Sequence, residues 1–194
     1  MTQAQAFHPY VHAAKAPHKP AVIMAGSGEV VTFQDMEDRS NQGAQFFRSI
    51  GLNKGDTIAL FMSNTARYFE LAWAAQRAGL YFTCISSRLT PPEVQYIVED
   101  SHTKVLFTTP DLADIAKATK AITNIERCFS VNGDIEGFER FEPLRDAMPK
   151  TRISDESAGG DMLYSSGTTG RPKGIRAPLD PNAPIDNDSV LRMI

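Results

Sequence analysis

Short apolar runs alternate with longer segments of helical periodicity along most of the chain. Runs of apolar residues bounded by glycine, proline or polar residues predict β-strands. The predicted strands cover residues 20–25, 30–33, 56–62, 81–86, 104–109, 127–131 and 161–166. Between them, apolar residues recur three or four positions apart, which predicts helices. The predicted helices cover residues 9–15, 35–50 and 65–78, a segment that begins at 90, and residues 111–121 and 143–147.

Capping residues mark where several of these helices begin and end. Thr32 is followed three positions later by Asp35, and Thr90 by Glu93, and both spacings are typical of a helix N-terminus. Gly51 is expected to end the helix that begins after Thr32, because glycine adopts the left-handed C-cap conformation at little cost. The glycine-containing turn at 26–29 predicts that the strands on either side of it form a hairpin.

The strand at 56–62 is apolar without interruption, as is typical of a strand buried on both faces. The next helix, capped by Asn64 or Thr65, is apolar on most sides, so Phe69 and Trp73 are expected in the core. Strands that alternate with helices predict an α/β fold, a mostly parallel sheet with helices on both faces. We expect one α/β unit over residues 1–177, followed by a proline- and aspartate-rich loop and the start of a further element over 178–194.

Composition restricts the possible functions. The chain has 194 residues, 42% of them hydrophobic, and a formal net charge of −3. This charge argues against broad electrostatic binding to nucleic acid. Cys84 and Cys128 lie in apolar stretches and are expected to be reduced and buried, whereas His8 and His12 are interpreted as surface residues. The sequence shows no signal peptide and no apolar run of membrane-spanning length, so we expect a cytoplasmic protein.

Glycines, hydroxyl side chains and a lysine follow directly after the strand predicted at 161–166. Glycine lets the backbone approach a ligand closely, and consecutive amide groups in such a turn form an anion-binding nest. Hydroxyl groups, including that of Tyr164, supply further donors, and Lys173 supplies a positive charge. This composition predicts a loop that binds phosphate. The candidate residues are Ser165, Ser166, Gly167, Thr168, Thr169, Gly170 and Lys173.

Two common nucleotide-binding patterns do not fit. Counted from Gly167, the second glycine of a Walker A loop would fall at position 172, which is Pro172. Gly26 and Gly28 begin a dinucleotide-binding pattern, but Val31 occupies the position of its third glycine. From composition alone, the run after the strand could also be a plain flexible loop.

The run from Ser165 to Gly174 resembles the signature of the adenylate-forming superfamily, the AMP-binding enzymes. The segments 55–86 and 88–109 resemble that superfamily's first βαβ units. Within the superfamily, the chain is most similar to acyl-CoA synthetases, which include fatty-acid–CoA ligases. The resemblance implies a nucleotide-binding ligase and an N-terminal α/β subdomain that ends in the phosphate loop.

The resemblance also implies a reaction. A small carboxylic acid attacks the α-phosphorus of ATP and releases pyrophosphate, and the thiol of coenzyme A then takes the acyl group from the acyl-adenylate. Mg²⁺ neutralises phosphate charge. The loop residues would hold the β- and γ-phosphates. Among them, Thr168, Thr169, Gly170 and Lys173 are the expected contacts, followed by Ser165, Ser166 and Gly167. No residue of the chain is assigned as a general acid, a general base or a metal ligand.

Two differences from the superfamily, in the segment after the phosphate loop and in chain length, leave alternatives open. Many members of the superfamily continue after the Lys-Gly pair with a histidine-bearing helix, whereas here Arg176 and Ala177 lead to Pro178. The substrate could therefore be that of another adenylate former, such as a luciferase or the adenylation domain of a peptide synthetase. The superfamily's members are much longer, so we expect an N-terminal fragment that is inactive alone and prone to self-association. A non-catalytic fragment that only binds nucleotide or a partner is the remaining alternative.

Overall fold

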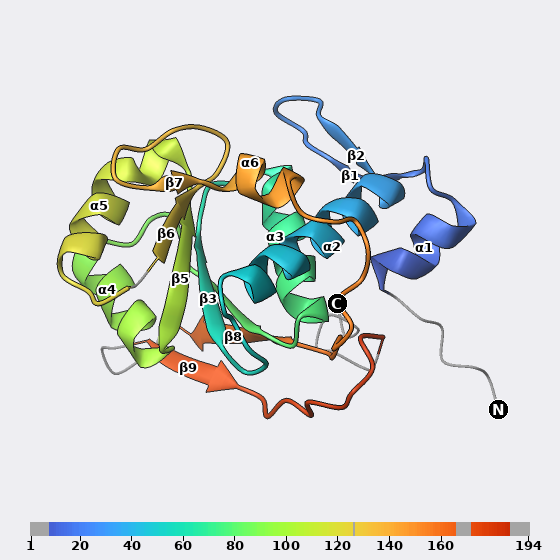
Figure 1. The fold of residues 1–194 in the computed structure, drawn as a ribbon. Helices are drawn as coiled ribbons and strands as arrows, with labels where there is room; N and C mark the ends of the chain where they lie inside the picture. Colours follow the sequence, from blue (N-terminus) through green and yellow to red (C-terminus); the bar gives the residue numbers. More distant parts are fainter. Residues whose placement is uncertain (1–7, 126, 166–171, 187–194) are drawn as a thin grey trace.

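The structure, a computed structural model, describes residues 8–125, 127–165 and 172–186. Within these residues, a seven-stranded sheet has the strand order β7-β6-β5-β3-β4-β8-β9 (Figure 1). Its strands are β3 (Thr57–Phe61), β4 (Tyr81–Cys84), β5 (Thr103–Thr108), β6 (Arg127–Ser130), β7 (Glu139–Arg140), β8 (Gly160–Ser165) and β9 (Lys173–Arg176). All neighbouring pairs are parallel except β8 and β9. A separate antiparallel hairpin is formed by β1 (Pro20–Ile23) and β2 (Val30–Thr32).

Helices cover both faces of the large sheet. The helices are α1 (Pro9–Lys15), α2 (Phe33–Ser49), α3 (Ala66–Arg77), α4 (Pro91–Asp100), α5 (Ala113–Ala121) and α6 (Phe141–Asp146). Residues of the central strand β3 alternate between two buried clusters. Ile58 and Leu60 pack in the cluster formed with α2, α3 and α6, whereas Ala59 and Phe61 pack in the cluster formed with α4 and α5 (Figure 1). The predicted α/β class, with a mostly parallel sheet between helical layers, is confirmed.

The predicted caps are formed by the expected residues. Thr32 and Asp35 exchange the two hydrogen bonds of a capping box at the start of α2, with N···O distances of 3.0 and 3.1 Å. Thr90 and Glu93 form the same arrangement at the start of α4. Gly51 follows α2 with φ of +85°, a left-handed conformation that favours glycine. The ends of α2 and the start of α4 therefore lie where the local capping residues predict them.

Three expectations from the sequence are wrong in the structure. Phe69 on α3 is 47% exposed, because it lies on the side of the helix that borders an open cavity rather than the sheet. Lys173–Arg176 forms an edge strand, although no strand was expected after the loop. His8 is buried: its Nδ1 accepts a hydrogen bond from the Tyr10 backbone N–H, and its ring packs edge-on against Trp73 with centroids 4.9 Å apart.

Burial of His8 makes stability depend on pH. Burial, with a contribution from the nearby Arg77 guanidinium, lowers the pKa of His8 to about 3. The unfolded chain binds a proton at His8 below about pH 6.5, whereas the folded chain does not, so stability is lost as the pH falls from 6.5 towards 3. We expect acidification from pH 7 to 5 to remove about 2 kcal/mol through this histidine. Urea unfolding at the two pH values measures the loss.

Two variants isolate the contribution of His8. His8→Asn keeps a side-chain acceptor at the start of α1 but cannot take up a proton near neutral pH, so it should lose this part of the pH dependence. His18→Asn, at an exposed position after α1, should keep it. Equal pH dependence in both variants and in the unchanged chain would refute the assignment to His8.

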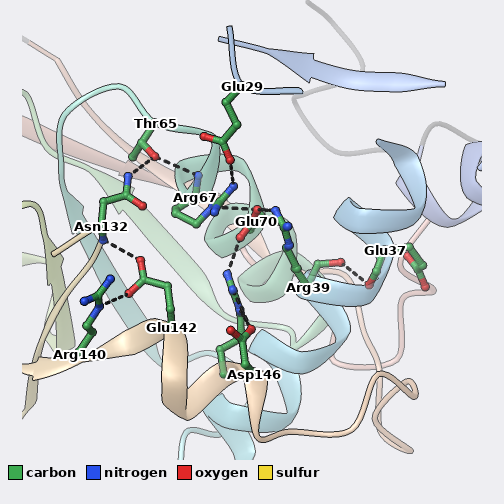
Figure 2. A network of polar contacts seen from close by, with 12 residues as sticks. Glu29, Glu37, Arg39, Thr65, Arg67, Glu70, Asn132, Arg140, Glu142 and Asp146 are labelled. Atoms are coloured by element: carbon green, nitrogen blue, oxygen red, sulfur yellow. Dashed lines mark hydrogen bonds and ion pairs between the residues drawn. The ribbon is translucent and has the colours of Figure 1, made fainter. Parts of the chain in front are cut away.

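A buried carboxylate joins three helices. Glu70 of α3 is 1% exposed and pairs with Arg39 of α2 at 2.8 Å, Arg67 of α3 at 2.9 Å and Arg145 of α6 at 2.6 Å (Figure 2). Arg67 also pairs with Glu29, at the start of the connection into β2, so the small hairpin is tied to the same network. Burial raises the pKa of the Glu70 carboxyl, and the guanidinium groups of Arg67 and Arg145 oppose this rise. We name these four residues the Glu70 cluster: Glu70, Arg39, Arg67 and Arg145.

The segment after β9 lies against the body of the protein. Residues 178–186 contain no helix or strand, and Ala183 and Ile185 are buried. The Ala183 carbonyl accepts a hydrogen bond from the Ala158 N–H at 2.9 Å, and the Ile185 carbonyl accepts one from Gln76 Nε2 at 2.7 Å. The described part of the chain contains no helix that is long and apolar enough to cross a membrane.

Candidate functional site

The hairpin of β8 and β9 presents the candidate loop. The two strands are antiparallel, with Tyr164 opposite Gly174 and Ser165 opposite Lys173 at the closed end. Ser165 and Lys173 are exposed, and Lys173 forms no ion pair with a described residue. The predicted loop residues Ser166, Gly167, Thr168, Thr169 and Gly170 lie outside the described residues. The structure therefore brings together the first and last candidate residues, one on each side of the loop.

The closed end of this hairpin is held by close packing and by a hydrogen bond to α4. The Tyr164 hydroxyl donates a hydrogen bond to Asp100 Oδ2 at 2.6 Å. Burial and the Asp100 carboxylate raise the pKa of Tyr164, so the phenol stays protonated and remains a donor. The sequence had suggested Tyr164 as a donor to phosphate, but its proton is engaged by Asp100. Any Cβ at Gly174 would lie 2.7 Å from Met162 Cε and 2.9 Å from Tyr164 Cζ, so glycine permits the close contact.

The closed end of the β8–β9 hairpin, at Ser165 and Lys173, lies at the edge of the sheet where α/β proteins usually bind ligands. β8 pairs in parallel with β4, so Ser165 lies at the same edge as the carboxyl end of β4. From β3 the chain enters α3 on one face of the sheet, whereas from β4 it enters α4 on the other face and then reaches β5 beyond β3. Open α/β sheets bind ligands in a crevice outside the carboxyl ends of their strands. β8, the first strand of the hairpin, lies next to β4 in the sheet (Figure 1).

A cavity of about 700 Å³ occupies this crevice. The connection after β3 contributes Met62 and Asn64, and the one after β4 contributes Ser86 and Ser87. Its wall also includes Phe69 of α3. Sequence reasoning missed this cavity, although polar residues directly after two buried strands are the signal that could have indicated it.

The two cysteines are free thiols, and burial keeps both of them protonated. Cys84 lines the cavity, is partly buried and is hydrogen-bonded to Tyr68, and burial raises its pKa. Burial raises the pKa of Cys128, which is fully buried, to about 11. Because the thiolate is the nucleophilic form, neither thiol is activated for covalent catalysis at neutral pH.

The described residues contain no group of three or more histidine, cysteine, aspartate or glutamate side chains that could hold a metal ion. At the open end of the hairpin, the Arg176 guanidinium stacks over the Tyr81 ring at 3.9 Å and donates a hydrogen bond to the Gly55 carbonyl at 3.1 Å. Arg176 is therefore engaged in fixing β9 to the sheet. Lys173 is the cation of this hairpin that faces solvent next to the loop.

Curated relatives resemble the chain over most of its length. A fatty acid–[acyl-carrier-protein] ligase from Streptomyces coeruleorubidus is 28% identical over 164 residues, which is 84% of this chain and 31% of the relative. A long-chain-fatty-acid–CoA ligase from Mycobacterium tuberculosis is 31% identical over 167 residues, which is 82% of this chain and 32% of the relative. The chain thus spans about a third of the length of these relatives.

Solved structures share the fold. An anthranilate–CoA ligase in complex with anthranoyl-AMP superposes with a TM-score of 0.77 at 22% identity, covering 90% of this chain and 35% of that one. The inhibitor-bound N-terminal domain of a Mycobacterium tuberculosis protein named FACL13 superposes with a TM-score of 0.73 at 26% identity, covering 87% of this chain and 42% of that one. The family described as AMP-binding enzyme matches residues 10–177, from α1 to the residue after β9. The chain therefore belongs to the AMP-binding enzymes and corresponds to their N-terminal part.

Proposed function

We propose that this chain supplies the triphosphate-binding part of an enzyme that activates a carboxylic acid with ATP and transfers the acyl group to coenzyme A. The observation that carries the proposal is the β8–β9 hairpin. It holds Ser165 opposite an exposed Lys173 at the carboxyl edge of the sheet, on either side of a loop rich in glycine and hydroxyl residues. The names of the relatives support the reaction class, because they include fatty-acid ligases that use coenzyme A or an acyl-carrier protein as acceptor.

In the proposed reaction, a carboxylate oxygen of the acid forms a bond to the α-phosphorus of ATP, and the bond from that phosphorus to the bridging oxygen breaks. Pyrophosphate leaves with the electron pair. The thiol of coenzyme A then attacks the acyl carbon, AMP leaves, and the thiol proton passes to solvent. Charge accumulates on the departing pyrophosphate, so a fixed cation and backbone N–H donors there lower the barrier.

The chain's own residues would act by positioning and by charge. Lys173 would pair with a β- or γ-phosphate oxygen, and Ser165, Ser166, Thr168 and Thr169 would donate hydroxyl hydrogen bonds. Gly167 and Gly170 would allow the backbone amides to approach the phosphates. Mg²⁺ would arrive bound to the phosphate oxygens of ATP, because it is usually held by substrate phosphates and one or two carboxylates rather than by a full protein cage.

The 194-residue chain by itself is expected to bind triphosphate weakly and to be catalytically inactive. Catalysis by positioning needs ATP, acid and acceptor in one geometry, and the chain spans only about a third of its relatives. In a loop open to water, a lysine–phosphate attraction falls to about 1 kcal/mol. We therefore expect a dissociation constant for ATP near 1 mM, which corresponds to a binding free energy of about −4 kcal/mol.

Two assays on the purified chain test this proposal. Nuclear magnetic resonance titration with ATP and Mg²⁺ should shift amide signals of the loop and of Lys173, and pyrophosphate should compete. Incubation with ATP, Mg²⁺, coenzyme A and a panel of fatty and aromatic acids should give no acid-dependent pyrophosphate. The absence of loop shifts at several times the expected dissociation constant would contradict the phosphate site. Acid-dependent pyrophosphate release would contradict the inactivity.

We further propose that the isolated chain self-associates through the outer face of the β8–β9 hairpin. Leu163 and Ile175 lie opposite each other there and are 47% and 63% exposed. β9 is also an edge strand, and an exposed apolar edge favours association with another chain. Sedimentation of the chain and of a Leu163→Lys, Ile175→Lys double variant tests this, because only the unchanged chain should associate as concentration rises.

A further inference from the structure

We propose that Asp100 is a positioning residue for the phosphate site, because it accepts a hydrogen bond from the Tyr164 hydroxyl and so fixes the closed end of the β8–β9 hairpin. Ser165 and Lys173 lie opposite each other at that closed end. The inference rests on the proposed function in taking these two residues to bind the phosphates of ATP. Asp100 is the last residue of α4, and it would act through Tyr164 rather than by touching the nucleotide.

The closed end of the hairpin extends beyond the parallel part of the sheet. Within the described residues, β8 pairs with β4 at Gly160 and Asp161, whereas its pairing with β9 runs from Met162 to Ser165. Past Asp161 the hairpin is therefore a ribbon of two strands. A two-stranded hairpin by itself is at best marginally stable in water. The position of the closed end consequently depends on the contacts that it makes with other elements.

Tyr164 provides such a contact on the side of α4. Its hydroxyl donates a hydrogen bond to Asp100 Oδ2 at 2.6 Å and lies 3.5 Å from the Ile97 carbonyl oxygen. The same ring lies against Gly174, the residue opposite Tyr164 on β9, where a Cβ would be 2.9 Å from Cζ and 3.0 Å from Oη of the tyrosine. Tyr164 thus touches α4 and both strands of the hairpin, one position before the pair formed by Ser165 and Lys173.

The stability of α4 does not explain the carboxylate at position 100. Glu99 and Asp100 are exposed in the last turn of the helix, where the helix dipole disfavours negative charge. Glu99 accepts a hydrogen bond from Gln95 of the same helix, whereas Asp100 accepts one from Tyr164 of a distant strand. A length of 2.6 Å is typical of a hydroxyl bonded to an ionised carboxylate, a bond about twice as strong as one between neutral groups. Asp100 is therefore suited to hold the hairpin, and Glu99 serves as its matched control.

Hydrogen exchange tests the tether without any substrate. We would measure backbone amide exchange in the 194-residue chain, at a concentration at which it sediments as a monomer. Asp100→Ala should speed exchange of the protected amides among residues 164–165 and 173–174 at least tenfold. Tyr164→Phe should do the same, although it removes only the hydroxyl and keeps the ring packing. Glu99→Ala should not, and the amide of Gly160, which is bonded to the Leu80 carbonyl, should keep its rate in every variant.

Acid-dependent ATP–pyrophosphate exchange in an active enzyme that contains this segment tests the consequence. Asp100→Ala and Tyr164→Phe should each lower kcat/KM for ATP about tenfold, as expected when one charged hydrogen bond to phosphate is misplaced, and should leave KM for the acid unchanged. Asp100→Asn keeps an oxygen acceptor and should restore most of the rate. Because both single variants remove the same bond, the double variant should be no slower than either of them.

The inference would be overturned by unchanged amide exchange in Asp100→Ala, or by additive losses of kcat/KM in the double variant. It would also be overturned if Asp100→Ala retained the kcat/KM of Glu99→Ala while Lys173→Ala lost activity, because the role of Asp100 would then be limited to stability. Faster amide exchange in Asp100→Ala together with full activity of Lys173→Ala would uphold the tether and overturn the proposed function instead.

Discussion

Replacing Glu70 by alanine is expected to lower the free energy of unfolding by about 3–5 kcal/mol, the usual cost of removing one partner from a buried ion pair. Glu70 is 1% exposed and is the shared partner of Arg39, Arg67 and Arg145. Without it, the three guanidinium groups lose their shared buried carboxylate, while Arg67 and Arg145 keep their pairs with Glu29 and Asp146. A domain of this kind is stabilised by about 5–15 kcal/mol in total, so the loss would remove a large share.

Urea unfolding followed by circular dichroism measures this loss, and three further variants interpret it. Glu136→Ala breaks an exposed pair with Lys117 and should change stability little, because such pairs are screened by water. Glu70→Gln keeps hydrogen-bonding capacity without the charge. Its loss of unfolding free energy should lie between those of Glu136→Ala and Glu70→Ala. Glu70→Leu combined with Arg145→Met should recover part of the loss, because it removes a buried charge of each sign. If Glu70→Ala cost no more than Glu136→Ala, the Glu70 cluster would not contribute to stability as argued.

Replacing Lys173 by alanine is expected to lower the rate of acid-dependent ATP–pyrophosphate exchange by roughly 10- to 100-fold in an active enzyme that contains this segment. The reason is the loss of one charged hydrogen bond to the departing pyrophosphate, worth about 1.5–3 kcal/mol. Lys173 begins β9 next to the loop and has no carboxylate partner among the described residues that would hold it elsewhere. The same change should abolish the weak ATP-induced amide shifts expected for the 194-residue chain.

Two controls separate the position of Lys173 from its charge. Lys173→Arg keeps a cation on the hairpin and should retain more exchange activity than Lys173→Ala. Lys15→Ala removes an exposed lysine at the end of α1 and changes the net charge equally, so it should leave exchange and binding unchanged. An unchanged exchange rate in Lys173→Ala would remove this lysine from the proposed mechanism.

Local sequence patterns were sufficient to predict where several elements begin and end. The cap at Thr32, the capping box at Thr90 and the left-handed glycine after α2 depend on contacts within a few residues, and the structure has each as predicted. The alternation of apolar runs with helical spacing also determined the fold class, because each pattern can bury its apolar side in few ways. The phosphate loop was predicted from its residues, and the family was identified from the same signature.

Which distant segments become neighbours depends on long-range packing, which local patterns do not report. The sequence does not show that β8 lies beside β4, that α6 brings Arg145 to Glu70, or that Asp100 accepts a hydrogen bond from the Tyr164 hydroxyl, since each contact joins residues more than 60 positions apart. It also misassigned His8 and Phe69. Periodicity reports the apolar character of a face, whereas burial depends on what packs against it. α1 and Trp73 pack around the histidine, whereas Phe69 borders cavities and stays uncovered.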